Sequence, residues 1–113
     1  MGKFEGFWKR GKKENEPDAI SKKELFKAAE WCLKGDSQSI FGHFDEAVKC
    51  YDKALEINPQ NADAWLNKGS AQDQLGLRDA VIHSYRVFIK VAPAQLAETI
   101  ELVRQRLREL EGD

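Results

Sequence analysis

Residues 28–61 read AAEWCLKGDSQSIFGHFDEAVKCYDKALEINPQN, and residues 62–95 follow without a gap as ADAWLNKGSAQDQLGLRDAVIHSYRVFIKVAPAQ. Nine positions are identical between the two stretches: Ala28/Ala62, Trp31/Trp65, Lys34/Lys68, Gly35/Gly69, Gln38/Gln72, Gly42/Gly76, Asp45/Asp79, Tyr51/Tyr85 and Pro59/Pro93. An internal period of this length is typical of repeat architectures, in which one unit cannot bury its apolar face alone and stacks on its neighbour. Such a stack presents an extended surface, so the repeat pattern predicts a binding module.

Start and stop signals divide the chain into five predicted helices. Ser21 and Glu24 form a capping box before the first helix, and Asn61 caps the third. Glycines end the first and third helices. The expected helices run from residue 22 towards 41, from about 45 to 57, over 62–75, from about 79 to 91, and over 96–111 after a start at Pro93. No segment alternates with period two, so the sequence predicts an all-α fold.

Apolar residues at intervals of three and four predict the buried faces. On the first helix they are Leu25, Ala28, Ala29, Trp31, Cys32 and Leu33; on the last they are Leu96, Ile100, Val103, Leu107 and Leu110. The last set predicts a helix that covers the end of the stack. Gly35 and Gly69 are expected where two helices approach closely. Tyr51 and Tyr85 are expected to bridge successive helices, each with a hydrogen-bond partner for its hydroxyl.

These residues carry a resemblance to tetratricopeptide repeat proteins. That family repeats a 34-residue pattern, W-x2-L-G-x2-Y, then A-x3-F, then A and P. The matching residues are Trp31, Gly35, Ala47, Tyr51, Ala54 and Pro59, then Trp65, Gly69, Gly76, Tyr85 and Pro93; the departures are Lys34, Lys68, Gln38, Gln72, Val81 and Phe88. The resemblance implies a right-handed helix-turn-helix solenoid of two 34-residue repeats plus a C-terminal capping helix. We expect this domain to cover 18–111.

Residues 1–17 precede the expected domain and hold five basic residues, together with Phe4, Phe7 and Trp8. We expect a flexible basic and aromatic arm. It is either a disordered terminus or a segment that meets an anionic membrane surface or a partner groove.

Composition excludes several classes of function. The chain has 113 residues, 42% hydrophobic and 33% charged, with a net charge of −1, so no basic field predicts nucleic-acid binding. It has no apolar stretch long enough to span a membrane. Two cysteines fit a reducing compartment, which favours the cytoplasm. The sequence has no glycine-rich phosphate loop, HExxH, CxxC or nucleophile elbow. We therefore expect no enzyme activity, no cofactor and no metal.

The family resemblance implies that the first helix of each repeat lines a concave groove that holds an extended peptide or a partner helix. The groove positions would be Asp36, Ser39, Asp63, Leu66, Asn67, Ser70, Asp73 and Gln74, with Ala29, Cys32 and Ile40 beside them. Their acidic members suggest a basic or amphipathic partner. The five-residue clamp by which some members hold chaperone tails is matched only at Asn67. An alternative is homotypic assembly, in which the exposed end near Leu25 and Phe26 pairs with a second copy.

Overall fold

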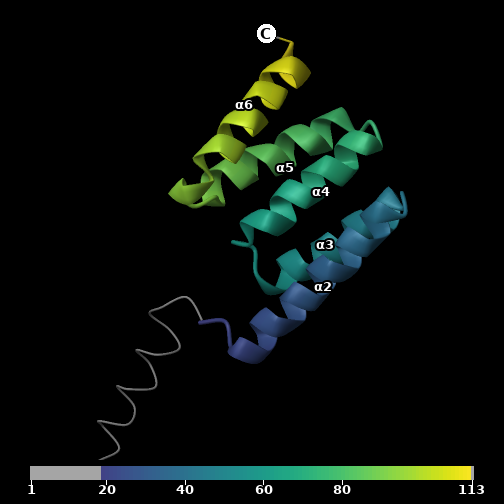
Figure 1. Ribbon diagram of the computed structural model, residues 1–113, viewed down its shortest axis with the longest axis vertical. Coiled ribbons are helices and arrows are strands. Elements are labelled where there is room, and N and C mark those ends of the chain that lie inside the picture. Colours follow the sequence, from purple (N-terminus) through teal and green to yellow (C-terminus); the bar gives the residue numbers. More distant parts are fainter. Residues whose placement is uncertain (1–18, 113) are drawn as a thin grey trace, which may run out of the picture.

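The computed structural model describes residues 19–112, so the predicted arm over residues 1–17 lies outside the described part. The helices are α2 (Lys22–Ile40), α3 (Phe44–Ile57), α4 (Ala62–Gln74), α5 (Arg78–Val91) and α6 (Ala97–Glu111), with a short 3₁₀ turn, η1 (Ala94–Leu96), before α6. Two helical pairs, α2–α3 and α4–α5, follow one another along the long axis, and α6 lies at the far end (Figure 1). The predicted all-α helix-turn-helix solenoid is confirmed.

Local signals explain the ends of these helices. The Ser21 hydroxyl accepts a hydrogen bond from the backbone N–H of Glu24, and the Glu24 carboxylate accepts one from the Ser21 backbone, which completes the capping box. The Asn61 side chain accepts from the backbone N–H of Ala64 and caps α4. Gly42 and Gly76 have φ values of 80° and 75°, a left-handed conformation that favours glycine and turns the chain after α2 and α4.

Helices approach closely at the two repeated glycine–tyrosine pairs. A Cβ added at Gly35 would lie 2.6 Å from Cε1 of Tyr51, and one at Gly69 would lie 2.5 Å from Cε1 of Tyr85. A Cβ at these distances would overlap the ring unless a neighbour shifted, so each tyrosine ring occupies the space that the missing Cβ leaves. The predicted close approach is confirmed in both repeats.

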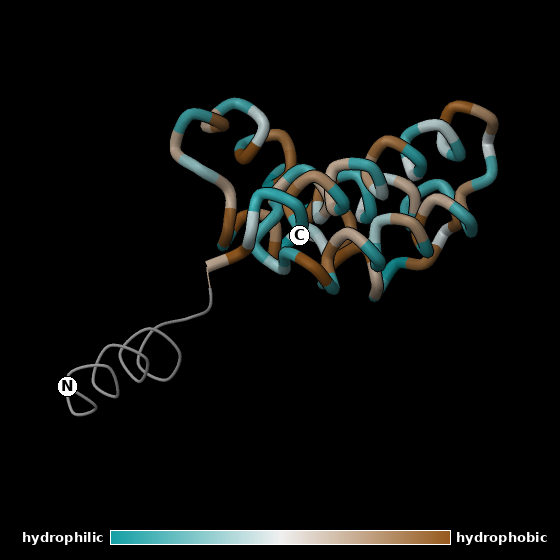
Figure 2. The backbone as a smooth tube through the Cα atoms, turned by 90° about the horizontal axis from the view of Figure 1, so that it is seen from below, coloured by the Kyte–Doolittle hydropathy of each residue, from teal (hydrophilic) through white to brown (hydrophobic). Residues whose placement is uncertain are grey.

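Hydrophobic contacts join successive helices, and Figure 2 shows hydrophobic positions interspersed with hydrophilic ones along the backbone. Between α3 and α4 the buried residues are Ala47, Tyr51, Ala54, Leu55, Ala64 and Ala71. Between α5 and α6 they are Val81, Tyr85, Phe88, Val103 and Leu107, with Leu96, Ile100 and Leu110 half-buried beside them. The last helix therefore covers the end of the stack, as its apolar stripe predicts.

Two expectations were wrong. On α2 only Ala28 of the predicted apolar face is fully buried, whereas Leu25 is 45% and Leu33 66% exposed. Those positions are spread around the helix, and α2 contacts other helices on one side only. Pro93 also does not begin the last helix: its ψ of 156° is extended, and α6 begins four residues later at Ala97. None of the helices that the structure describes is both long and apolar enough to cross a membrane.

Candidate functional site: a polar hollow between the repeats

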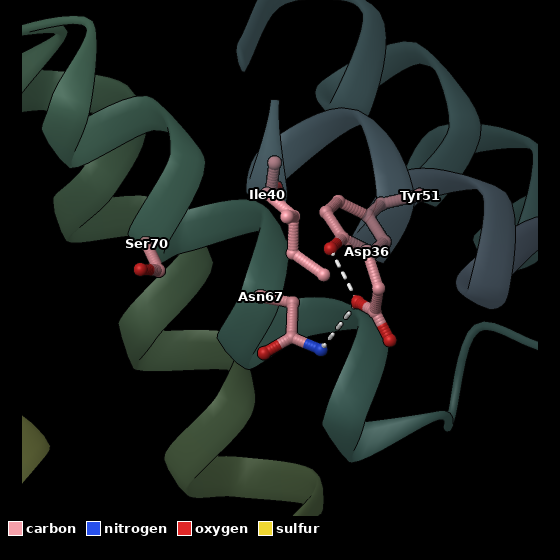
Figure 3. Close-up of a pocket in the computed structure, with 6 residues that line it drawn as sticks. Asp36, Ile40, Tyr51, Asn67 and Ser70 are labelled. Atoms are coloured by element: carbon pink, nitrogen blue, oxygen red, sulfur yellow. Dashed lines mark hydrogen bonds between the residues drawn. The ribbon is translucent and has the colours of Figure 1, made fainter. Parts of the chain in front are cut away.

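The first helices of the two repeats, α2 and α4, lie beside a shallow hollow of about 240 Å³. Its lining combines three groove positions predicted on α2 with two on α4 and one tyrosine from α3: Asp36, Ser39, Ile40, Asn67, Ser70 and Tyr51. Figure 3 shows Asp36 between Tyr51 and Asn67, with Ser70 on the neighbouring helix. Four of the predicted site residues, Asp36, Ser39, Asn67 and Ser70, are therefore brought together.

Asp36 is the centre of the polar contacts in this hollow. Its Oδ1 atom accepts a hydrogen bond of 2.5 Å from the Tyr51 hydroxyl and one of 3.3 Å from Nδ2 of Asn67 (Figure 3). Both donors are neutral groups, so they hold the carboxylate in position without cancelling its charge. The Oδ2 atom accepts no hydrogen bond from the described residues and remains available to a ligand.

Tyr51 links this hollow to the core. Its side chain is only 1% exposed, and its hydroxyl reaches Asp36 at the surface. Burial raises the pKa of Tyr51 well above its usual range, and the hydrogen bond to the Asp36 carboxylate raises it further. The Tyr51 hydroxyl thus stays protonated, and by donating its hydrogen bond it holds the Asp36 carboxylate in position. The predicted partner for this hydroxyl is confirmed.

The second tyrosine differs. The Tyr85 hydroxyl makes no hydrogen bond within residues 19–112, so the predicted partner was wrong for this residue. Burial raises the pKa of Tyr85, with a further rise from the charge of Asp73 and a lowering from Arg106. The same contact chemistry is therefore not repeated in the second unit.

Asp73 is held by an arginine of α6. Nε and Nη2 of Arg106 donate to its two carboxylate oxygens at 2.9 and 2.8 Å, a bidentate pair. The hydrogen bond to Asp73, and then the one to Glu109, raise the pKa of Arg106 above its usual range. Asp73 is thus paired within the chain, and its charge is largely offset at the groove.

The other predicted site residues lie apart from the hollow. Asp63 is exposed and lines a second hollow of about 390 Å³ between the start of α4 and the segment after α5. Leu66 packs against the C-terminal core. Gln74 is exposed at the end of α4. Cys32 is half-buried beside α4, where burial raises the pKa of its thiol.

Two lysines replace the leucine that the family pattern prefers, and the structure gives a reason. Nζ of Lys34 lies 4.6 Å from the ring centroid of Trp31, and Nζ of Lys68 lies 5.1 Å from that of Trp65. Each lysine therefore covers the tryptophan one turn before it and makes a cation–π contact. Lys68 also pairs with Asp52 of α3 at 2.6 Å.

Sequence reasoning missed the role of Tyr51 as a groove residue and of Arg106 as the partner of Asp73. The spacing held a signal for the Arg106 contact, although not for the Tyr51 contact, which joins residues only 15 positions apart. Asp36 meets Asn67 31 residues later, and Asp73 meets Arg106 33 residues later, each close to one repeat length. Polar residues that stand about one repeat apart on successive first helices are therefore candidates for groove contacts.

The comparisons with known proteins agree with this architecture. Residues 42–76, which include α3 and α4, match a family described as TPR repeat, the tetratricopeptide repeat. A TPR repeat-containing protein of Methanocaldococcus jannaschii is 42% identical over 38 residues, which are 34% of this chain and 11% of that protein. The chain thus spans only a small part of that relative's length. The 34-residue period, the stacked helical pairs and these matches together show that residues 42–76 are similar to a tetratricopeptide repeat, the unit to which the whole helical stack bears a likeness.

Proposed function

We propose that the chain is a non-catalytic protein–protein interaction module that binds a peptide or partner segment in its concave groove. Tetratricopeptide repeats are in general protein–protein interaction modules. The observation that carries the proposal is the hollow between α2 and α4, where Asp36 is fixed by Tyr51 and Asn67. A prearranged acceptor of this kind lowers the ordering cost that a ligand would otherwise meet on binding.

The partner segment that fits best carries hydrogen-bond donors, including basic side chains. Within residues 19–112 one carboxylate oxygen of Asp36 accepts no hydrogen bond, and Asp63 is exposed near the start of α4. Asp73 contributes less to this preference because Arg106 already pairs with it. A basic side chain at Asp36 would gain a charge-assisted hydrogen bond, whereas the exposed Asp63 would act mainly on encounter rate and selectivity. A cytoplasmic location remains a prediction from the sequence.

A selection from a random peptide library tests the groove. Peptides retained by the wild-type protein would be counter-selected against Ser70→Arg, which places a long cationic side chain at the edge of the hollow. Ser70 is exposed and makes no hydrogen bond to the described residues, so this change leaves the fold intact. We expect the selected peptides to be rich in Lys and Arg and to lose at least about 10-fold in affinity on Ser70→Arg.

A matched control distinguishes a loss of affinity caused by blocking the hollow from one caused by added positive charge elsewhere on the protein. Gln105→Arg on α6 adds the same charge at another exposed position. We expect it to leave the affinity within about twofold of the wild type, a difference of less than about 0.5 kcal/mol. Equal losses for both variants, or peptides that bind Ser70→Arg as tightly as the wild type, would show that the hollow is not the binding surface.

A further inference from the structure

The exposed apolar residues are concentrated on one helix. Five of the seven large hydrophobic side chains that are exposed within residues 19–112 belong to α2 and its C-cap: Leu25, Phe26, Leu33, Ile40 and Phe41; the other two are Leu77 and Leu102. Three of the five, Phe26, Leu33 and Ile40, are 70%, 66% and 81% exposed and recur every seven residues. On a helix of 3.6 residues per turn they fall within about 40° of one line that is about 21 Å long. We call these three residues the α2 stripe.

The repeat shows what this side of a first helix normally does. Leu33 and Ser37 correspond, 34 residues later, to Asn67 and Ala71 of α4. Ala71 is 2% exposed and packs on α3, and Asn67 donates a hydrogen bond to α2. In α4 this side is therefore the stacking surface for the preceding helical pair. In α2 the equivalent positions are the apolar Leu33 and the polar Ser37; both are exposed, and no element within residues 19–112 covers this side.

The other end of the stack does not offer a matching surface. The outer side of α6 carries Glu98, Gln105 and Glu109 around a single exposed leucine, Leu102. A head-to-tail contact between copies would therefore set the apolar α2 stripe against a polar helix. Among residues 19–112 the surface that matches the α2 stripe in length and apolar character is the α2 stripe itself.

We propose that two copies of the chain associate through their α2 helices, antiparallel and related by a two-fold axis at Leu33. The stripe is symmetric about Leu33, because Phe26 and Ile40 lie seven residues to either side. In this arrangement Leu33 packs on Leu33 of the second copy, and Phe26 packs on Ile40 of the second copy. A self-complementary patch of this kind, in which the same residues meet across a two-fold axis, produces a closed dimer.

The residues before α2 are a poorer match to this surface. Their aromatic residues, Phe4, Phe7 and Trp8, lie within five consecutive positions. Even a fully extended chain spans at most about 14 Å over that distance, which is less than the length of the α2 stripe. A second α2 helix matches the whole stripe at once, and it is the occupant to which we commit.

Sedimentation velocity on the full chain, from about 1 µM to about 1 mM, tests the pairing. We expect the weight-average mass of the wild type to rise from one protomer towards two. Leu33→Glu and Leu33→Lys should each raise the dissociation constant by about 100-fold or more, because apolar burial is lost and like charges meet at the axis. An equimolar mixture of the two variants should form a dimer again, since opposite charges then meet.

Leu102→Glu is the control, because Leu102 is as exposed as Leu33 but stands alone on α6. It should dimerise like the wild type, and the thermal melts of all variants should coincide at low concentration. A wild type that stays monomeric over the whole range would overturn the proposal. So would dimers that survive Leu33→Glu. Failure of the mixed variants to associate would overturn the two-fold axis at Leu33.

Discussion

The two repeats share their packing but differ in their groove chemistry. In both, a glycine of the first helix admits a tyrosine ring from the second, at equivalent distances of 2.6 and 2.5 Å from the Cβ position. In the first repeat, Tyr51 continues outward to Asp36 and Asn67. In the second, Tyr85 stops short of any hydrogen-bond partner among the described residues, and the nearby Asp73 is paired with Arg106.

The difference shows which positions of a repeat determine which property. The glycine and tyrosine are identical in both repeats and determine how the helices pack. The groove positions are not identical, since Asp36 corresponds to Ser70 and Ser39 to Asp73. Asp73 of the second repeat therefore stands three positions later on its helix than Asp36 does in the first, where α6 can reach it. Conserved packing and variable chemistry along one helix allow one fold to present different surfaces.

Truncating either tyrosine should have the largest effect. Tyr51→Ala and Tyr85→Ala should each lower the free energy of unfolding by about 3–5 kcal/mol, as for other large-to-small aromatic changes in a core. For a domain of this size that loss approaches the whole stability. Denaturation with urea, followed by far-UV circular dichroism, measures it. A loss of less than about 1 kcal/mol in one repeat would show that the two tyrosines are not equivalent in packing.

Adding a methyl group at the glycines tests the same contact from the other side. Gly35→Ala and Gly69→Ala should each cost about 1–3 kcal/mol, because the new Cβ meets a buried tyrosine ring rather than a flexible side-chain end. Ser37→Ala, at an exposed position of α2, is the control and should change stability by less than about 0.5 kcal/mol. Urea midpoints that are unchanged by both glycine variants would contradict the close approach.

Removing only the tyrosine hydroxyl should affect stability differently in the two repeats. Tyr51→Phe removes the hydrogen bond to the Asp36 carboxylate and should cost about 1–2 kcal/mol. Tyr85→Phe removes a hydroxyl without a partner and should change stability by less than about 0.5 kcal/mol. The same urea titrations compare the two. Equal costs in both repeats would remove the distinction drawn between them.

The alkaline pH dependence should show a smaller effect of the same hydroxyl. The pKa of Tyr51 is raised in the folded chain, so the unfolded chain loses this proton first as the pH increases. The stability that this proton contributes is fully present below the pKa of tyrosine in the unfolded chain, which is about 10, and it is lost as the pH rises beyond that value. Stability measured between pH 8 and about 11 should therefore fall less steeply in Tyr51→Phe than in the wild type. Parallel curves would argue against a raised pKa.

Most of the fold could be predicted because its determinants are local or periodic. The capping box at Ser21, the cap at Asn61 and the left-handed glycines act within a few residues, and the 34-residue period gives the stacking. The burial of α2 could not be predicted in this way. An apolar residue such as Leu33 has the same local pattern whether or not another helix covers it, and only the position of α2 at the end of the stack leaves it exposed.

The candidate site was predicted in part. Asp36, Ser39, Asn67 and Ser70 share one hollow because they lie on the facing sides of two neighbouring first helices. The pairing of Asp73 was not predicted, because it depends on how far α6 leans towards α4, and no short motif records that angle. Only the structure therefore shows that the charge of Asp73, at the α6 end of the groove, is offset by an arginine.

Chemical-shift mapping with a peptide from the groove selection tests the central claim most directly. In the ¹⁵N-labelled protein, added peptide should shift the backbone amides of Ser39, Asn67 and Ser70 and the side-chain amide of Asn67. The amides of Glu56 on α3 and Gln105 on α6 should stay in place, since both side chains are exposed away from the hollow. Shifts centred on α3 or α6, with the hollow residues unmoved, would contradict the groove as the binding surface.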